Sequence, residues 1–132
     1  MAELTYPLGA TGRESVRTAS GRTVAEITLD RVVSGQVGPE DVAVAPETLL
    51  LQADFAEAGG NPQLAENLRR GAELAAFSDD ELLQFYEMLR PGRSSADELD
   101  SLAASLEGRG ADRCAALVRE ARAAYMRRRL IA

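Results

Sequence analysis

Three hydroxyl residues in this chain are each followed, three positions later, by a glutamate at the start of an apolar run. The pairs are Thr23 with Glu26, Ser78 with Glu81, and Ser95 with Glu98. In such a capping box the hydroxyl accepts a hydrogen bond from the glutamate N–H, and the carboxylate accepts one from the N–H of the capping residue. Each box predicts where a helix begins, so the pattern indicates a largely helical fold.

Proline, glycine and asparagine predict the other helix ends. Pro46 suits the first position of a helix, and the two glycines at 59 and 60 suit its end. Asn61 can cap the next helix, which we expect over residues 62–77. The helix of the second capping box must end at Arg90, because a residue before proline is disfavoured in the helical region. We also expect a helix from Ser95 to Gly108 or Gly110, one from about Asp112, and a short one after Thr23 that is interrupted near Thr28.

Apolar residues recur at helical spacing along four of these helices, which predicts one buried face on each. The four faces are Leu64, Leu68, Ala72 and Ala75; Leu82, Phe85, Tyr86 and Leu89; Leu99, Leu102, Ala103 and Leu106; and Cys114, Leu117, Val118, Ala121, Ala124 and Tyr125. The helix after Pro46 differs, because three consecutive leucines at 49–51 project about 100° apart and make it apolar on several faces. A small domain does not cover all of these faces by itself.

Residues 1–22 show neither helical nor strand periodicity and mix glycine and proline with serine and threonine. We expect an extended N-terminal arm over residues 1–22 and one helical domain over residues 23–132. A chain of 132 residues is of ordinary size for a single domain. The predicted fold is all-α, a small helical domain whose N-terminal arm packs on a partner subunit.

The residue inventory excludes several kinds of chemistry. The chain has no histidine and one cysteine, so it cannot build an ordinary zinc site, a Ser/His/Asp triad or a histidine-ligated cofactor site alone. All 15 basic residues are arginine, which excludes a Schiff-base lysine and a phosphate-loop lysine. The formal net charge of -6 argues against a nucleic-acid-binding protein, whose affinity comes largely from basic side chains.

No group of residues predicts a catalytic site. Asp79 and Asp80 are adjacent on a helix, so they project apart, and they suit the positive helix N-terminus. The glycines of "GATGRES" lack the lysine and the preceding strand of a phosphate loop. Cys114 lies on an apolar face and is expected in the core, while the arginines of "RRRL" suit the negative end of the last helix. We therefore expect no catalytic, cofactor-binding or metal-binding residues in this chain.

The first residues show no charged segment followed by an apolar stretch, and a single cysteine cannot form a disulfide within the chain. No apolar run approaches the roughly 20 residues of a membrane helix. We therefore expect a cytoplasmic protein without membrane contact.

An arm without periodicity and a helix that is apolar on several faces share one explanation. Both can be ordered and covered by a partner chain, since surplus apolar surface marks interaction sites. The residues therefore predict a subunit of a larger assembly.

Several segments together resemble a known family. They are "YPL" at 6–8, "TLDRVVSGQV" at 28–37, "PETLLLQADFAEAGGNPQLAENLRRGAELAAF" at 46–77, "YEMLRPGRSSADEL" at 86–99 and "CAALVREARAAY" at 114–125. In this order they are similar to the small subunit of adenosylcobalamin-dependent diol dehydratase or glycerol dehydratase. The resemblance covers nearly the whole chain.

The resemblance implies a helical small subunit that wraps part of a large subunit, in a dimer of heterotrimers of large, medium and small subunits. It implies adenosylcobalamin held between the large and medium subunits, with none bound by this chain alone. The implied reaction is the dehydration of propane-1,2-diol to propanal, or of glycerol to 3-hydroxypropanal and water, by a radical mechanism. This chain would stabilise and assemble the large subunit without catalytic residues.

Two departures from the family pattern bear on function. Ser78 stands where relatives tend to have proline, and a capping serine at a helix start should leave function unchanged. Relatives associated with protein-shelled microcompartments often carry a longer N-terminal extension. Only five residues precede Tyr6, so the free cytoplasm is expected, although encapsulation stays open.

We expect the partner subunits to contact Tyr6, Leu50, Leu51, Phe55, Tyr86, Arg90 and Arg93. The stretch "RPGRS" is expected to hold Arg90 and Arg93 outward, towards a carboxylate or carbonyl of the large subunit. The alternative is that both arginines are solvated.

A rival interpretation is a free-standing helical adaptor or regulator that binds another protein. A DNA-binding helix-turn-helix over residues 78–107 is disfavoured, because the expected recognition helix is acidic. A small subunit of the chaperone that reactivates the dehydratase is a further candidate, but its pattern is not seen here.

Overall fold

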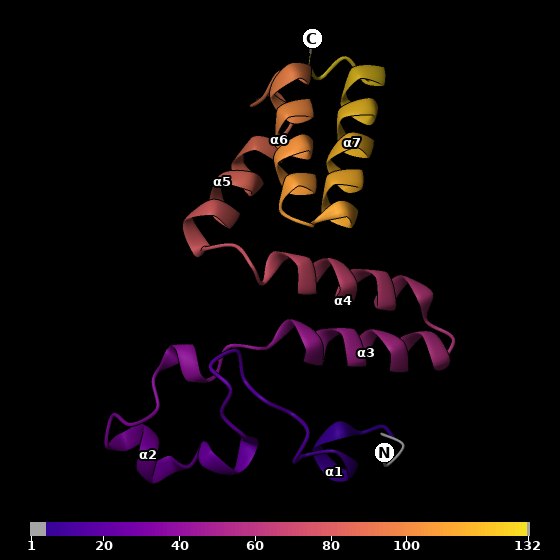
Figure 1. Cartoon of the computed structure of the whole chain (residues 1–132). Coiled ribbons are helices and arrows are strands. Elements are labelled where there is room, and N and C mark those ends of the chain that lie inside the picture. Colours follow the sequence, from indigo (N-terminus) through magenta and orange to yellow (C-terminus); the bar gives the residue numbers. More distant parts are fainter. Residues whose placement is uncertain (1–4, 132) are drawn as a thin grey trace. The chain divides into compact units, whose positions relative to one another are not determined.

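The structure, a computed structural model, describes residues 5–131 and is all-α (Figure 1). The helices are α1 (Leu8–Thr11), α2 (Leu29–Val33), α3 (Pro46–Ala58), α4 (Pro62–Leu74), α5 (Asp79–Leu89), α6 (Ala96–Gly108) and α7 (Asp112–Arg127), with two single 3₁₀ turns at Val24–Glu26 and Pro39–Asp41. Within the described range there is no strand, only the isolated bridges Arg17–Thr23 and Thr18–Val44. The predicted fold class is confirmed.

The chain divides into two compact units, Met1–Ala72 and Glu73–Ala132, which are called the first and second unit below. The predicted boundary between an arm over 1–22 and a domain over 23–132 stays a prediction. Among residues 5–131, no helix combines the length and the apolar character needed to cross a membrane.

The capping boxes begin α5 and α6 as predicted. The Ser78 N–H donates to the Glu81 carboxylate at 2.8 Å, and the Glu81 N–H donates to the Ser78 hydroxyl at 3.3 Å. Ser95 and Glu98 make the same pair of bonds at 2.7 and 3.2 Å. Each box stabilises a helix start by satisfying N–H groups that have no partner within the helix.

The capping box at Thr23 begins only a 3₁₀ turn. The Glu26 carboxylate accepts from both the N–H and the hydroxyl of Thr23, each at 2.8 Å. The chain is extended again at Ile27, and the Thr28 hydroxyl then accepts the Arg31 N–H at 3.4 Å to begin α2. The predicted interruption near Thr28 is thereby confirmed.

Two expected helical features are wrong in detail. Residues 5–22 include a helical turn, α1, that their aperiodic sequence does not predict. Helix α4 ends at Leu74 and not near residue 77, because the Phe77 N–H bonds to the Leu74 carbonyl in a turn and Phe77 enters the core.

The second unit is built around a continuous apolar core. Helices α6 and α7 lie side by side and bury the residues Leu99, Leu102, Ala103, Leu106, Cys114, Ala115 and Val118 between them, together with Phe77 and Ala111 (Figure 1). Phe77 packs edge-to-face on Phe85 with the ring centroids 5.3 Å apart. Cys114 is buried as predicted, and the Tyr125 hydroxyl donates to the Leu89 carbonyl at 2.6 Å.

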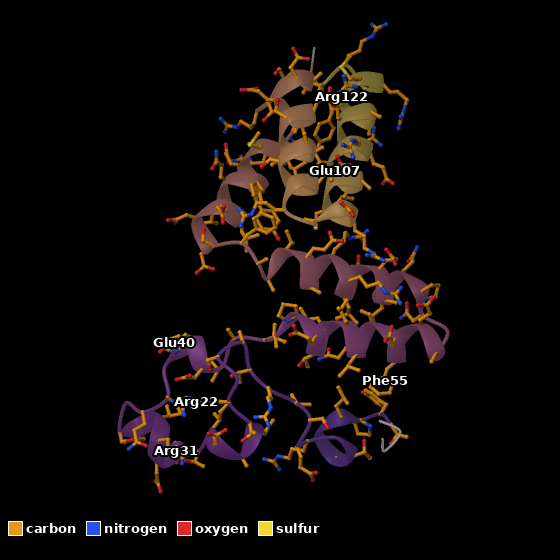
Figure 2. All side chains as sticks on the ribbon, in the orientation of Figure 1. Arg22, Arg31, Glu40, Phe55, Glu107 and Arg122 are labelled. Carbon is orange, nitrogen blue, oxygen red and sulfur yellow. The ribbon has the colours of Figure 1, made fainter. Side chains whose placement is uncertain are left out.

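Leu117 was expected on the buried face of the last helix, but it is 43% exposed. The buried face is centred on Cys114, Ala115 and Val118, and Leu117 lies about 100° away from that centre at 100° per residue. Ion pairs flank this seam, from Arg119 to Glu107 and from Arg122 Nε to Asp100 Oδ2 at 2.9 Å (Figure 2). Hydrogen bonding to Arg119 lowers the pKa of Glu107.

The first unit contains the antiparallel pair α3 and α4, joined by the turn at Gly59, Gly60 and Asn61 (Figure 1). Gly60 has φ +81°, a conformation that favours glycine, and the Asn61 side chain accepts the Leu64 N–H at 3.1 Å as the predicted cap. Arg69 of α4 binds Asp54 of α3 at 3.4 Å and also pairs with Glu57 and Glu66. Hydrogen bonds to Glu57 and then Glu66 raise the pKa of Arg69.

Glu73 is a helix cap supplied from a distant part of the sequence. The N-cap residue of helix α7 is Ala111, which offers no capping side chain. The Glu73 carboxylate accepts the N–H groups of Arg113 at 3.1 Å and Cys114 at 2.9 Å instead. A carboxylate at this position also suits the positive end of the helix dipole.

We predict that Glu73→Ala loosens the first turn of α7. Loss of a cap costs about 1 kcal/mol, so exchange of the Arg113 and Cys114 amide hydrogens should accelerate about fivefold. Hydrogen exchange followed by NMR measures this directly. Glu120→Ala is the matched control, since Glu120 is an exposed residue of the same helix. Equal protection in the wild type and Glu73→Ala would contradict the capping role.

Candidate functional site

One apolar concavity in the first unit is a groove formed by residues 6–9, α3 and α4. It measures about 710 Å³ and is lined by Tyr6, Pro7, Leu8, Gly9, Gln52, Phe55, Ala56, Gly59, Leu64 and Leu68. Leu8 is buried at its base, whereas Tyr6 is 78% exposed. We call this set the apolar groove.

Tyr6 and Phe55 form one wall of the apolar groove. Their ring centroids lie 6.1 Å apart in an edge-to-face arrangement, which is a favourable geometry for aromatic pairs. Phe55 projects from α3 towards the N-terminal residues (Figure 2). Two residues that the sequence analysis assigned to a partner interface are thus brought together, although 49 positions separate them (55 − 6 = 49).

The other predicted interface residues lie on separate surfaces. Leu50 is exposed on α3 and Leu51 is half-buried; neither lines the apolar groove. Tyr86 is 65% exposed on α5, next to Leu83 on the same helix face at a spacing of three. Whether these residues contact a partner stays a prediction.

Arg90 and Arg93 share one carboxylate of their own unit. Arg90 Nη1 lies 3.0 Å from Glu87 Oε2, and Arg93 Nε lies 3.2 Å from Glu87 Oε1. All three side chains are more than half exposed. Two arginines on one glutamate leave a net positive charge on this surface, so a second carboxylate could still be bound there.

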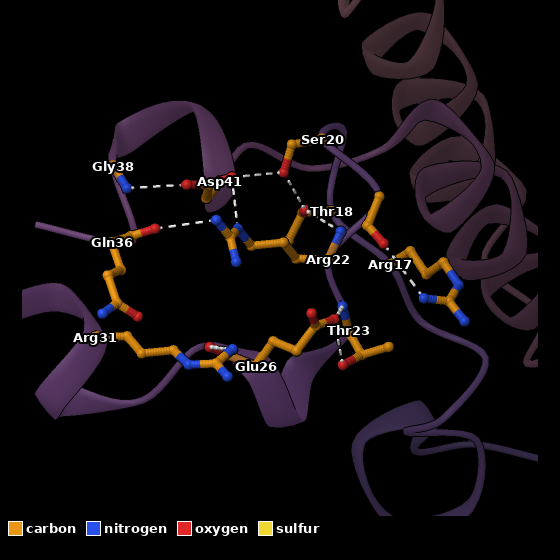
Figure 3. Close-up of polar contacts among 11 residues, drawn as sticks. Arg17, Thr18, Ser20, Arg22, Thr23, Glu26, Arg31, Gln36, Gly38 and Asp41 are labelled. Atoms are coloured by element: carbon orange, nitrogen blue, oxygen red, sulfur yellow. Dashed lines mark hydrogen bonds and ion pairs between the residues drawn. The ribbon is translucent and has the colours of Figure 1, made fainter.

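A polar network holds the N-terminal segment to the turn that precedes α3 (Figure 3). Asp41 is buried and accepts from Ser20 Oγ at 2.8 Å and from the Gly38 N–H at 3.0 Å. Arg22 Nε pairs with the same carboxylate at 2.8 Å, and Arg22 Nη2 donates to the Gln36 carbonyl at 3.0 Å. Asp41 therefore connects the N-terminal segment at Ser20 and Arg22 to the turn at Gly38, two segments that share no helix or strand.

The pKa shifts of Asp41 and Arg22 follow from the hydrogen bonds of this polar network. Donation from the Gly38 N–H, and then from Arg22 and Ser20, lowers the pKa of Asp41 from 3.8 to about 2. Hydrogen bonding to Asp41 raises the pKa of Arg22 in turn. The Asp41 carboxylate is therefore held in its charged, accepting form.

The sequence analysis did not assign several residues to the surfaces on which they lie. Leu64 and Leu68 line the apolar groove, although their helical spacing predicted only that they lie on a buried helix face. Asp41 was not singled out, but "GPED" carries a usable signal, because proline opens a helical turn and an aspartate three residues after Gly38 can accept its N–H. Arg22 has no comparable local signal.

A second groove, of about 500 Å³, lies between α5 and α6 of the second unit. Phe85, Met88 and Leu102 form its apolar part, and Arg109 pairs with Glu81 at one end. Among the described residues no group of three or more acidic, histidine or cysteine side chains is arranged to hold a metal ion. The described surfaces thus offer apolar and ionic contacts suited to protein binding.

We predict that Asp41→Asn weakens the polar network around Asp41, and that the size of this effect depends on pH. The folded pKa lies below the ordinary value of 3.8, so the stabilisation is complete above about pH 4 and is lost as the pH falls through about 2. The amide hydrogens of Thr18 and Ala19, bonded to the Arg22 and Ala43 carbonyls, report on this region through hydrogen exchange.

The two proteins should differ in this protection at pH 6 and converge at pH 2. Asp30→Asn, which changes an exposed aspartate of α2, is the control and should follow the wild type throughout. A difference between wild type and Asp41→Asn that stays constant from pH 6 to pH 2 would refute the assigned charge state.

Comparison with known proteins gives a consistent result. The whole chain, residues 1–132, matches the family described as dehydratase small subunit. It is 46% identical over 125 residues to the propanediol dehydratase small subunit of Citrobacter freundii, a match that covers 94% of this chain and 73% of that protein. It is 45% identical over 125 residues to the protein of the same name from Salmonella typhimurium, covering 94% of this chain and 72% of that protein.

The predicted resemblance is confirmed by these matches, and the family match over residues 1–132 includes both units. The chain therefore belongs to the dehydratase small subunit family.

Proposed function

We propose that this chain is the non-catalytic small subunit of a cytoplasmic, adenosylcobalamin-dependent diol or glycerol dehydratase, in which it stabilises and assembles the large subunit. The complex is a dimer of heterotrimers of large, medium and small subunits. It converts propane-1,2-diol to propanal, glycerol to 3-hydroxypropanal, or both, by a radical mechanism. The names of the two relatives support a dehydratase role.

The observation that carries the assembly role is the unequal packing of the two units. In the first unit the buried apolar side chains are mostly alanines, at positions 45, 53, 65 and 72, with Leu8 and Val37. Larger side chains of that unit, such as Leu29 and Val33 of α2, are mostly exposed. Burying one side chain of this size contributes about 1.5–3 kcal/mol, so a partner surface would stabilise the first unit substantially.

The chain's own residues do not fit a role in holding cobalamin. The sequence has no histidine, and its one thiol, Cys114, is buried in the core of the second unit. As the family resemblance implies, the proposal places adenosylcobalamin on the large and medium subunits and assigns no chemical step to this chain. Its contribution to activity in this proposal is structural.

A free-standing helical adaptor is the second candidate. It is favoured by the second unit, whose buried apolar residues form one cluster within that unit. An adaptor would be monomeric and cooperative in isolation throughout its length. The apolar surface exposed on the first unit argues for the subunit assignment instead.

A tagged copy of this chain, recovered from its native cells, tests the proposed function. We predict that two larger chains co-purify and that the preparation forms aldehyde from propane-1,2-diol or glycerol only when adenosylcobalamin is present. Large and medium subunits expressed without this chain should be less soluble or less active. Recovery of the chain alone, folded and inactive, would favour the adaptor.

The assembled complex also tests the predicted interface role of Arg90 and Arg93. We predict that the double variant Arg90→Ala/Arg93→Ala dissociates at lower salt than the wild type, because it cannot bind a partner carboxylate. Glu87→Gln is the matched control, since it frees both arginines from their carboxylate but keeps their charge. Size-exclusion chromatography across a sodium chloride series measures the effect.

Glu87→Gln should assemble at least as well as the wild type. If the double variant keeps wild-type salt resistance, both arginines are only solvated in the complex.

A further inference from the structure

The groove between α5 and α6, called the α5–α6 groove below, lies wholly within the second unit and has an apolar floor. Phe85 and Met88 of α5 are half-buried there, and Leu102 of α6 is buried. The exposed Ser101 and Ser105 of α6 add uncharged polar groups. The second unit therefore leaves two large apolar side chains of α5 only partly covered.

The α5–α6 groove is long enough for a peptide segment. Its lining follows α6 from Asp97 to Arg109, which is about 18 Å at 1.5 Å per residue. This length accommodates about five residues of extended chain, or about three turns of helix.

An ion pair closes one end of the α5–α6 groove. Helices α5 and α6 run in opposite directions, so Arg109, which follows α6, pairs with Glu81 near the start of α5 (Figure 1). Arg109 also donates to the Ala76 carbonyl at 3.2 Å, and its Cζ lies 4.0 Å from the centroid of the Phe77 ring. The charges of Glu81 and Arg109 compensate each other, and these contacts fix the arginine in place.

The opposite end of the α5–α6 groove is acidic. Asp97 and Glu98 are exposed residues in the first turn of α6. Glu98 Oε2 accepts the Ser95 N–H at 2.7 Å, and Asp97 has no hydrogen-bond or ion-pair partner among residues 5–131. Neither carboxylate is paired with an arginine in that part of the chain. This end of the groove therefore presents two negative charges without a countercharge.

The helices around the groove add to this negative charge. Each of α5 and α6 carries four acidic residues and no basic residue. Unpaired carboxylates beside an apolar floor are complementary to a segment that has both apolar and basic side chains. An acidic segment would meet like charge, and a wholly apolar one would remove water from the carboxylates without compensation.

We propose that the α5–α6 groove binds a basic, apolar segment of a partner subunit. Apolar side chains of that segment cover Phe85 and Met88, and its arginine or lysine binds Asp97 and Glu98. The inference rests on the proposed function for the existence of partner subunits, and it adds the chemistry of one contact with them. Its affinity comes from burial of the floor, and its specificity comes from the carboxylates.

Asp97→Arg tests the proposal by reversing one charge in the acidic end of the groove. Asp80→Arg is the matched control, because Asp80 is exposed and lies outside the groove. Each aspartate is the second residue of a helix that begins after a capping serine, so both variants lose the same interaction with a helix dipole. Binding of each full-length chain to the large and medium subunits is measured by biolayer interferometry.

We expect Asp97→Arg to raise the Kd about tenfold, and Asp80→Arg to leave it within about twofold of wild type. Circular dichroism confirms the helix content of each variant. Equal Kd values for the wild type and Asp97→Arg, or an equal loss in both variants, would overturn the docking site but leave the proposed function intact. Absence of binding by the wild-type chain would refute the proposed function and this inference with it.

A photo-crosslinking residue at position 101, in the assembled complex, identifies the occupant. Ser101 lines the groove, whereas Ala104 is exposed on the same helix outside it and gives the control position. We expect position 101 to attach to a peptide of the large or medium subunit in which a basic residue stands beside apolar ones. Replacement of that basic residue by glutamate should weaken binding to the wild type and restore binding to Asp97→Arg.

Failure of this charge exchange to restore binding would overturn the assigned contact with Asp97. Attachment of position 101 to an acidic or uncharged peptide, attachment to a second copy of this chain, or no attachment at all would overturn the proposed occupant.

Discussion

In the second unit, the packing of large apolar side chains against one another is concentrated between α6 and α7. Leu99, Leu102 and Leu106 fill the seam from one helix, and Cys114 and Val118 fill it from the other. Among the described residues of the first unit no comparable set of large buried side chains occurs, and polar contacts join several of its elements. Asp41 connects the N-terminal segment to the turn before α3, and Arg69 connects α3 to α4. Hydrogen bonds and ion pairs fix geometry but add modest net stability, which supports the proposal that a partner stabilises this unit.

Helix ends were predictable because they depend on chemistry within a few residues. The hydroxyl and carboxylate of a capping box are three positions apart, so the starts of α5 and α6 follow from Ser78 and Ser95. Proline and the glycine pair act in the same local way at the ends of α3 and α5. The interrupted helix near Thr28 was also predictable, since its hydroxyl caps a new helix.

Features that depend on distant residues were not predictable from periodicity. Leu117 follows the helical spacing of its neighbours, yet the position of α6 decides which side of α7 is covered. The groove formed by Tyr6, Phe55 and Leu64 requires three segments to meet, and the apolar run of α3 indicates only that some face needs covering. The family was recognised because whole segments match, but the matching segments themselves do not state which side chains are left exposed.

The capping of α7 by Glu73 has a consequence for the order in which the chain can fold. The carboxylate and the amides that it binds are separated by 40 and 41 residues, so the contact closes a loop that contains α5 and α6. Closing such a loop costs entropy that only other contacts within it can offset. During synthesis, residue 73 leaves the ribosome well before residue 113 does. The cap of the last helix therefore depends on the arrangement of the intervening helices, which brings its first turn back to Glu73.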